Sequence, residues 1–193
     1  GRLTFMQQPT EKEIYTAWSE QSYDQAFSLL ATAYASIMYR TALRIVLEHT
    51  LAQDVVQDAS LKIWRAMPTF KGKSTFSTWT YRIVVNESLS ALRKKRAPNV
   101  DISQMDIGVP DSPYYSPDDI LNALHQAVSQ LPEKQRITFQ LRYFDEKPYA
   151  EIAEILGTSI GGLKANYHLA REKVKMHVQA LNPSSSFASK QIV

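Results

Sequence analysis

Apolar residues recur every three or four positions along most of the chain, which is the spacing of one face of an α-helix. In the N-terminal half this pattern predicts three helices, over about 27–45, 52–67 and 75–96. Their apolar faces carry Phe27, Leu30, Ala31, Tyr34, Met38, Ala42 and Ile45 in the first helix, Val55, Ala59, Ile63 and Met67 in the second, and Phe76, Trp79 and Ile83 in the third. Pro68 ends the second helix, since proline has no backbone donor. The N-terminal half is therefore predicted to be a helical domain.

The C-terminal half shows the same periodicity, interrupted by a turn. Four apolar stripes predict four helices here, and Pro132 opens the second of them. The first two stripes are Ile120, Leu121, Leu124, Val128 and Leu131, followed by Ile137, Leu141 and Phe144. The last two are Tyr149, Ile152, Ala153 and Leu156, followed by Leu163, Tyr167, Ala170 and Val174. Gly157 stands where a left-handed C-cap is expected, and Ser159 can cap the last helix. Two helices joined by a glycine-containing turn are typical of a helix-turn-helix, with a plain helical hairpin as the alternative.

Proline and aspartate separate the two helical halves. Residues 97–119 contain four of the nine prolines and five Asp, without Lys or Arg. Each proline biases the preceding residue away from helix. We therefore predict an all-α fold of two small helical domains, over 10–96 and 119–181, joined by an extended acidic, proline-rich linker over 97–118. The last residues, 182–193, lack periodicity and are predicted to be a disordered tail.

Composition narrows the function classes. None of the 193 residues is cysteine, which excludes a disulfide framework, a thiolate metal site and a cysteine nucleophile. The four histidines are scattered, and Asp54 and Asp58 lack a third ligand nearby, so we predict no catalytic site, metal or cofactor. The net charge of +3 is too small to indicate a nucleic-acid partner by itself. No apolar run approaches the roughly 20 residues that span a bilayer, and residues 1–9 lack the pattern of a signal peptide, so we expect a cytoplasmic protein.

Two segments nevertheless carry side chains suited to nucleic acid. Between 70 and 96, aromatic residues alternate with cations: Phe70, Phe76, Trp79 and Tyr81 with Lys71, Lys73, Arg82 and the basic run 93–96. Aromatic faces stack on unpaired bases while cations follow the phosphates, which is how single strands are held. Phe76 is interpreted as a core residue, and Trp79 and Tyr81 suit either role. In the last helix, Lys164, Asn166, His168 and Arg171 lie off the apolar face, as a major-groove reader requires.

Two longer segments resemble a known family in order and spacing. The segment 52–96, which begins AQDVVQDASLKIWR, resembles region 2 of the extracytoplasmic-function sigma factors, group-four members of the sigma-70 family. The segment 129–174, which contains PYAEIAEILGTSIGGLKANYHLAREKV, resembles region 4 of the same family. The resemblance extends over about 23–180. It implies an alternative sigma factor without catalytic activity of its own, which binds core RNA polymerase, recognises minus-35 and minus-10 promoter elements and promotes strand opening. An anti-sigma factor is implied as a further partner.

The same resemblance implies three sites. The polymerase contacts are the β′ clamp helices and the β flap, and the implied clamp-binding residues are Asp54, Gln57, Asp58, Lys62 and Trp64. The implied minus-10 residues are Phe70, Lys71, Lys73, Ser74, Thr75, Trp79, Tyr81, Arg82 and Asn86. Phe70 and Asn86 are expected to be walls of a pocket for one flipped base. The implied minus-35 residues are Ser159, Gly162, Lys164, Ala165, Asn166, His168 and Arg171.

Some residues depart from the family pattern. The family often has Arg or Lys at the positions of Asn166 and Leu169 and Thr at Gly162, and Pro148 stands at the usual capping position. Fewer cations predict weaker phosphate anchoring. Two alternative functions remain open: a helix-turn-helix regulator that acts on duplex DNA without sigma activity, and an interaction scaffold with no role on DNA. The first explains residues 149–175 but leaves the aromatic and basic segment 70–96 unaccounted for.

Overall fold

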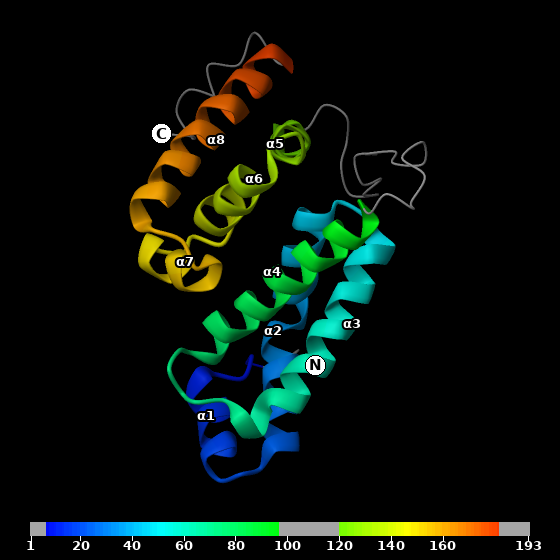
Figure 1. Cartoon of the computed structure of the whole chain (residues 1–193), viewed down its shortest axis with the longest axis vertical. Helices are drawn as coiled ribbons and strands as arrows, with labels where there is room; N and C mark the ends of the chain where they lie inside the picture. The colour runs from blue at the N-terminus through cyan, green and yellow to red at the C-terminus, as the bar shows by residue number, and fades with distance from the viewer. Residues whose placement is uncertain (1–6, 97–119, 182–193) are drawn as a thin grey trace, which may run out of the picture. The chain divides into compact units, whose positions relative to one another are not determined.

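The computed structural model describes residues 7–96 and 120–181, so the predicted linker and tail lie outside the described residues. The chain divides into two compact units. The N-terminal unit holds the residues up to Val46 and Thr50–Lys95, and the C-terminal unit holds Leu47–His49 and the residues from Arg96 onward. Every regular element in the described ranges is helical (Figure 1), which confirms the predicted all-α class.

The N-terminal unit consists of four α-helices and one short 3-10 turn. They are α1 (Glu11–Ser19), α2 (Tyr23–Val46), α3 (His49–Ala66), η1 (Met67–Thr69) and α4 (Phe76–Lys95). The apolar spacing did not predict α1, whose nine residues bury only Ile14 and Ala17. A capping box starts this helix: Glu13 N–H donates to Thr10 Oγ1, and Thr10 N–H donates to the Glu13 carboxylate. Since α1 packs on both α2 and α4, it completes the unit.

The buried faces of α2 and α3 follow the predicted spacing. Leu30, Met38, Ala42 and Ile45 are buried in α2, and Val55, Ala59 and Ile63 are buried in α3. The remaining predicted α2 positions, Phe27, Ala31 and Tyr34, are half-buried. The predicted start of α3 at Ala52 is three residues late, because the helix begins at His49. Pro68 lies in η1, directly after the end of α3, as expected.

The predicted apolar face of α4 is only partly right. Phe76 is buried, but Trp79 and Ile83 are half-buried. The face that packs into the core runs instead through Thr78, Thr80, Tyr81, Val84, Val85, Ser88 and Leu92. Because Phe76 is the first residue of the helix, its burial depends on the aromatic residues around it and does not define the core face of the later turns.

The C-terminal unit consists of α5 (Ile120–Ser129), α6 (Glu133–Phe139), the π-helical turn η3 (Gln140–Phe144), α7 (Tyr149–Leu156) and α8 (Ile160–Leu181). One core cluster comprises Leu124, Ala127, Val128, Leu131, Phe139, Ala170, Val174 and Val178, with Tyr143, Phe144 and Tyr167 packed against it. One predicted core position is wrong, since Leu121 is 44% exposed. In α7, Ile152 and Ile155 are buried, whereas the predicted positions Tyr149, Ala153 and Leu156 are half-buried.

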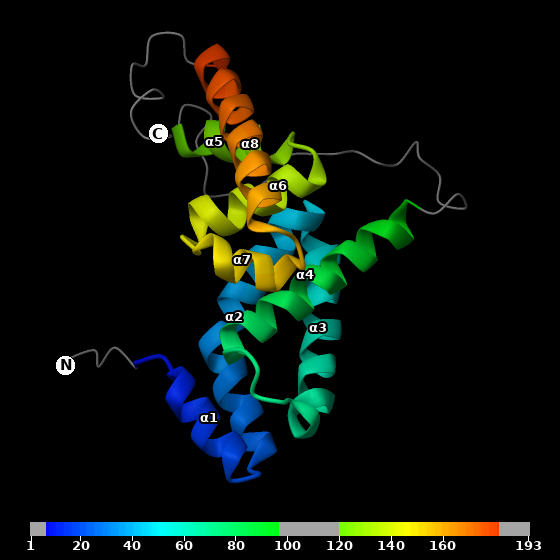
Figure 2. The ribbon, with the colours of Figure 1, turned by 60° about the vertical axis from the view of Figure 1, so that its left-hand side comes forward.

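The turn between α7 and α8 has the predicted helix-turn-helix geometry (Figure 2). Gly157 adopts a left-handed conformation with φ 65° and ψ 35°, and its N–H donates to Ala153 O at 2.8 Å. Ser159 Oγ accepts a hydrogen bond from Gly162 N–H at 3.1 Å, which caps α8. On α8, Leu163, Ala170 and Val174 are buried and Tyr167 is half-buried, so the predicted apolar face is confirmed.

Candidate nucleic-acid interface

The loop 70–75 leads into α4 and is held by a specific backbone conformation. Gly72 has φ +68°, a left-handed value that costs a non-glycine residue about 1–2 kcal/mol. Lys71 and Lys73 flank this glycine and are exposed. Ser74 Oγ donates to Thr75 O at 3.1 Å, within the loop itself. The loop thus presents two cations on a turn whose shape depends on glycine.

Thr75 is the N-cap of α4. Its Oγ1 accepts from Thr78 N–H at 3.1 Å, and its carbonyl accepts from Trp79 N–H at 3.0 Å. The Thr75 hydroxyl also lies 3.1 Å from Thr78 Oγ1. This side chain was expected to contact minus-10 DNA, but capping already uses its hydroxyl.

Phe70 is part of an aromatic cluster at the start of α4. Its ring centroid lies 4.5 Å from that of Phe76, 4.7 Å from Trp79 and 5.4 Å from Trp18. Trp18 in α1 also donates from Nε1 to Met67 O at 2.9 Å. Trp18 was not identified from the sequence, because a lone tryptophan before the first predicted helix carries no local signal of its partners 49 or more residues away.

One face of α4 stays outside the core and carries three of the expected minus-10 residues. Trp79 and Arg82 are half-buried and Asn86 is exposed. Their spacing of three and four residues places them along one side of the helix. Tyr81 does not belong with them: it is 5% exposed and falls on the opposite, core-facing side with Val84 and Val85. The expectation that Tyr81 supports a melted strand is therefore wrong for this structure.

Phe70 and Asn86 lie near the same face of α4 but at different heights. The Phe70 ring packs at a tilt of 42° against Trp79, and Asn86 is seven residues beyond Trp79, about 10 Å along the helix axis. Seven residues are close to two full turns, so Trp79 and Asn86 point the same way. That Phe70 and Asn86 form the walls of one base pocket stays a prediction.

The expected polymerase-binding residues line the outer face of α3. Asp54, Gln57, Asp58, Lys62 and Trp64 are all exposed. Trp64 is 49% exposed, and its Nε1 donates to Asp24 Oδ1 at 3.1 Å. Lys62 forms an ion pair with Glu87 of α4. These two side chains are therefore held in place on α3, while both carboxylates are exposed to solvent.

The expected minus-35 residues divide between contact and support. Lys164, Ala165 and His168 are exposed on α8, and Asn166 and Arg171 are half-buried. Ser159 and Gly162 form the N-cap described above, which occupies the serine hydroxyl. These two residues shape the start of α8, and the remaining five form its outward face.

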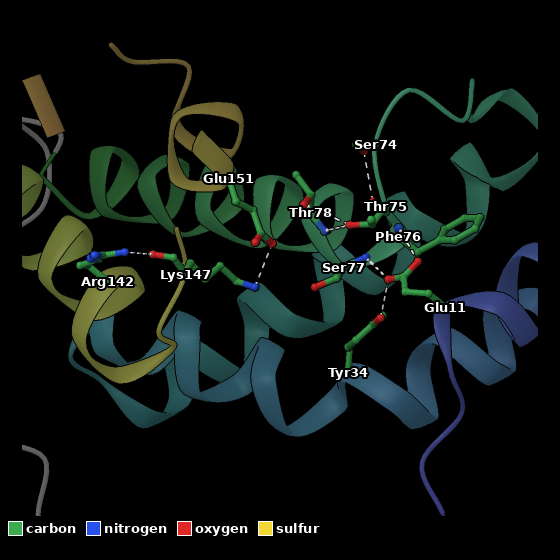
Figure 3. Close-up of polar contacts among 10 residues, drawn as sticks. All are labelled: Glu11, Tyr34, Ser74, Thr75, Phe76, Ser77, Thr78, Arg142, Lys147 and Glu151. Carbon is green, nitrogen blue, oxygen red and sulfur yellow. Dashed lines mark hydrogen bonds and ion pairs between the residues drawn. The ribbon is translucent and has the colours of Figure 1, made fainter. Parts of the chain in front are cut away.

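A cation and aromatic cluster adjoins the start of α8. Arg142 lies with its guanidinium carbon 4.3 Å from the Tyr149 ring centroid, and Lys164 Nζ lies 5.8 Å from the same centroid. Figure 3 shows Arg142 directed at Lys147, whose carbonyl accepts from Arg142 Nη1 at 3.0 Å. Burial, with a smaller effect of Tyr149, raises the pKa of Tyr167 in the same cluster. The sequence did not indicate Arg142 as a partner of this cluster. Arg142 lies in the π-helical turn η3, whose side chains do not follow the three-and-four spacing of an α-helix.

A metal site and a membrane-spanning helix are both absent from the residues that the structure describes. Nowhere in 7–96 or 120–181 do three or more His, Asp or Glu residues gather as a metal site would require. Within the same ranges, no helix is both long enough and apolar enough to cross a bilayer.

Comparison with known proteins places these features in a family. The chain is 32% identical over 171 residues to RNA polymerase sigma-H factor of Pseudomonas aeruginosa, covering 81% of this chain and 88% of that protein. It is 31% identical over 176 residues to ECF RNA polymerase sigma-E factor of Escherichia coli, covering 83% and 91%. The chain belongs to the ECF sigma factors of the sigma-70 family. It is an alternative sigma factor, a regulatory factor that acts in transcription initiation with core RNA polymerase at promoter DNA.

The two units correspond to two regions of the sigma-70 family. The Sigma-70 region 2 family model matches residues 30–97, and the Sigma-70 region 4 family model matches residues 121–174. The structure is similar to the sigma factor RpoE in complex with the anti-sigma factor NepR from Bartonella quintana, with a TM-score of 0.63 and 25% identity over 86% of this chain and 99% of that chain. CnrH in complex with the cytosolic domain of CnrY also matches, with a TM-score of 0.63 and 19% identity over 91% of this chain and 98% of that chain, which supports the fold alone.

Proposed function

We propose that the exposed face of α4 and the loop 70–75 capture the non-template strand of the minus-10 element. The carrying observation is that Trp79, Arg82 and Asn86 share a face outside the core, directly after a loop with two exposed lysines. Aromatic stacking contributes about 1–3 kcal/mol per base, and separating one stacked step costs roughly 1.4 kcal/mol. A few captured bases therefore offset the opening of a short bubble.

Within this face, each side chain has a distinct role. Trp79, which packs against Phe70 and is half-buried, offers its exposed surface to a base. Lys71, Lys73 and Arg82 hold phosphates, and Asn86 donates to and accepts from one base edge. Phe70 supports this arrangement through its ring contacts with Trp18, Phe76 and Trp79, which fix the loop.

We further propose that α8 reads the minus-35 duplex. Lys164, Asn166 and His168 contact base edges in the major groove, and Arg171 holds a phosphate. The capped turn at Ser159 sets the entry angle of the helix. Tyr149 limits the freedom of Lys164, because an aromatic face attracts an ammonium group.

The outer face of α3 is proposed as the docking surface for the β′ clamp helices of the polymerase. Asp54 and Asp58 supply two exposed carboxylates, and Trp64 supplies a large half-exposed aromatic surface held by Asp24. Aromatic residues of this kind are common anchors of protein interfaces. The β flap is proposed as the second polymerase contact.

An anti-sigma factor is proposed as the regulatory partner. The similar RpoE structure was solved with the anti-sigma factor NepR, and this chain shares 25% identity with that RpoE over nearly the whole of it. The proposed place of action is the cytoplasm, where core RNA polymerase transcribes the genome.

The test begins with run-off transcription from genomic fragments, using purified core polymerase and the full chain, to obtain a promoter. On that promoter, Asn86→Ala should leave polymerase binding intact and lower permanganate reactivity of the minus-10 bases about tenfold, because about 1–3 kcal/mol of base recognition is lost. A pre-melted template should restore only part of the activity, since melting is supplied but base recognition is still missing.

The matched control is Gln25→Ala, which removes another exposed side-chain amide, from α2. It should open the promoter like the wild-type chain. Normal opening by the double variant Phe70→Ala and Asn86→Ala would show that these residues have no part in strand capture.

A further inference from the structure

The carboxylate of Glu11 lies at the start of α4, although Glu11 belongs to α1. Its Oε2 accepts from Phe76 N–H at 2.9 Å, and its Oε1 accepts from Ser77 N–H at 2.6 Å. Figure 3 shows the carboxylate between these two backbone groups and the Tyr34 hydroxyl, which donates to Oε1 at 2.5 Å. One side chain therefore joins α1, α2 and α4.

These contacts supply acceptors for the first N–H groups of α4. The first turn of a helix leaves four N–H groups without intrahelical partners. In α4 the first intrahelical bond runs from Trp79 N–H to the Thr75 carbonyl, and the Thr75 side chain accepts from Thr78 N–H. Glu11 accepts from Phe76 and Ser77, and its negative charge suits the positive end of the helix dipole.

The other end of the loop 70–75 is also held by α1. Trp18 donates from Nε1 to Met67 O at 2.9 Å, and its ring packs edge-on against Phe70 at 5.4 Å between centroids. A Cβ at Gly72 would lie 3.9 Å from the Trp18 ring, so the indole also lies close to the turn of the loop at Gly72. One short helix thus contacts the residues before, within and after the loop.

The carboxylate is itself held in position. The capping box of Thr10 and Glu13 fixes the first turn of α1, where Glu11 is the first residue. Tyr34 is half-buried, and its burial and the nearby Glu11 carboxylate both raise the pKa of its hydroxyl, so Tyr34 stays a donor to Glu11 at neutral pH. This geometry satisfies all three donors with one carboxylate.

We infer that α1 is a brace that holds the loop 70–75 in its strand-capturing conformation. Glu11 and Trp18 are its positioning residues for promoter opening. The inference rests on the proposed function of the loop and adds what sets its conformation. Neither residue needs to touch DNA. Both act through the backbone of 67–77, whose order determines where Lys71, Lys73 and Trp79 stand.

The effect of the α1 brace on the loop is measured by hydrogen–deuterium exchange of the full chain, without polymerase or DNA. Glu11→Ala leaves Phe76 and Ser77 without these acceptors, and the peptide covering 70–79 should exchange at least about tenfold faster. Glu11→Gln keeps one acceptor oxygen and should give an intermediate rate. Trp18→Phe keeps a ring but removes the donor to Met67, and should loosen the same peptide.

The matched control is Glu20→Gln, which makes the same charge change at the exposed C-terminal end of α1, about 13 Å from Glu11. Its exchange rates over 70–79 should equal those of the wild-type chain. An unchanged exchange rate of this peptide in Glu11→Ala would show directly that α1 does not hold the loop in place.

The functional consequence is measured with holoenzyme on the selected promoter. Glu11→Ala and Trp18→Phe should bind core polymerase within about twofold of the wild-type chain, while permanganate reactivity at minus-10 falls about tenfold. A pre-melted template should restore much of the lost activity, since the loop is displaced and not altered in its contacting side chains. Glu11→Gln should again be intermediate.

Three further results would overturn the inference. Faster exchange with normal opening would show that loop order is irrelevant to opening. Loss of polymerase binding in all three variants, with reduced helicity, would show a purely structural role. Equal defects on duplex and pre-melted templates would show that the variants damage another step. Failure of the proposed function is distinguishable, because it appears as normal opening in Lys71→Ala with Lys73→Ala, whatever the exchange rates show.

Discussion

Single residues in this protein often have a role different from the one that their type suggests. Thr75 and Ser159 were expected to contact DNA, yet their hydroxyls accept from Thr78 and Gly162 and cap α4 and α8. Ser and Thr are preferred at such positions because a short side chain can reach the N–H groups of the first turn. Both hydroxyls therefore set the start of a helix, and a DNA contact by either residue stays a prediction.

The adjacent glycines at the start of α8 allow a test of this capping. A Cβ at Gly161 would meet nothing within 4 Å, whereas a Cβ at Gly162 would lie 3.1 Å from Ser159 Oγ. Gly161→Ala should raise stability by about 0.5 kcal/mol, since alanine loses less backbone entropy in a helix. Gly162→Ala should give no gain, or a loss of up to about 1 kcal/mol, because it disturbs the cap.

Thermal unfolding of the full chain, followed by circular dichroism, checks the pair. The Gly161→Ala variant serves as the control for helix propensity, so the difference between the two midpoints isolates the cap. A larger stabilisation from Gly162→Ala than from Gly161→Ala would contradict this account.

At the level of helices, α4 and α8 divide their surfaces in the same way. Each buries one stripe, Tyr81, Val84 and Val85 in α4 and Leu163, Ala170 and Val174 in α8. Each leaves another stripe with cations and amides to solvent. Periodicity alone identified the buried stripe of α8, but in α4 the aromatic residues Trp79 and Tyr81 differ by two positions and only packing decides which one is buried.

For α8, the two kinds of DNA contact predict different mutant behaviour. Asn166→Ala should change the preferred minus-35 sequence, since a base-edge contact contributes about 1–3 kcal/mol of discrimination. Arg171→Ala should weaken all sequences alike and reduce the dependence of affinity on salt, because a phosphate contact carries no sequence information. Selection from a minus-35 library at two salt concentrations separates these effects. The same selected motif and the same affinity for both variants would mean that α8 is not the reading helix.

For the molecule as a whole, the small net charge hides a strong separation of charge along the chain. The segment 70–96 holds seven Lys and Arg against one Glu, whereas 97–119 holds five Asp and no cation. A net charge of +3 over 193 residues therefore says little about partners, because seven of the cations are concentrated on one segment.

Association with the polymerase is predicted to depend on the acidic face of α3. The double charge reversal Asp54→Lys and Asp58→Lys should weaken binding to core polymerase at least about tenfold, because two exposed carboxylates lose their complementary partners. Circular dichroism should show unchanged helicity, since both side chains are exposed. The control reversal is Glu154→Lys on the exposed side of α7 in the other unit, which should leave this affinity unchanged. Equal affinity of the α3 variant and the wild-type chain in a titration would exclude this face as the docking surface.

Short-range spacing was enough to predict most of the helices and the helix-turn-helix turn, and the resemblance of two segments to known sigma factors predicted the family. Gly157 and Ser159 act on residues within four positions, and the apolar stripes of α2, α3 and α8 follow from helical geometry. Packing in three dimensions settled which aromatic residue of α4 is buried, that Leu121 is exposed, and that Phe70 belongs to a cluster with Trp18. It also brought Glu11 to the start of α4, 65 and 66 residues away in sequence. Contacts at such separations leave no local periodic signal, because they depend on how the helices pack against one another and not on the spacing within any one of them.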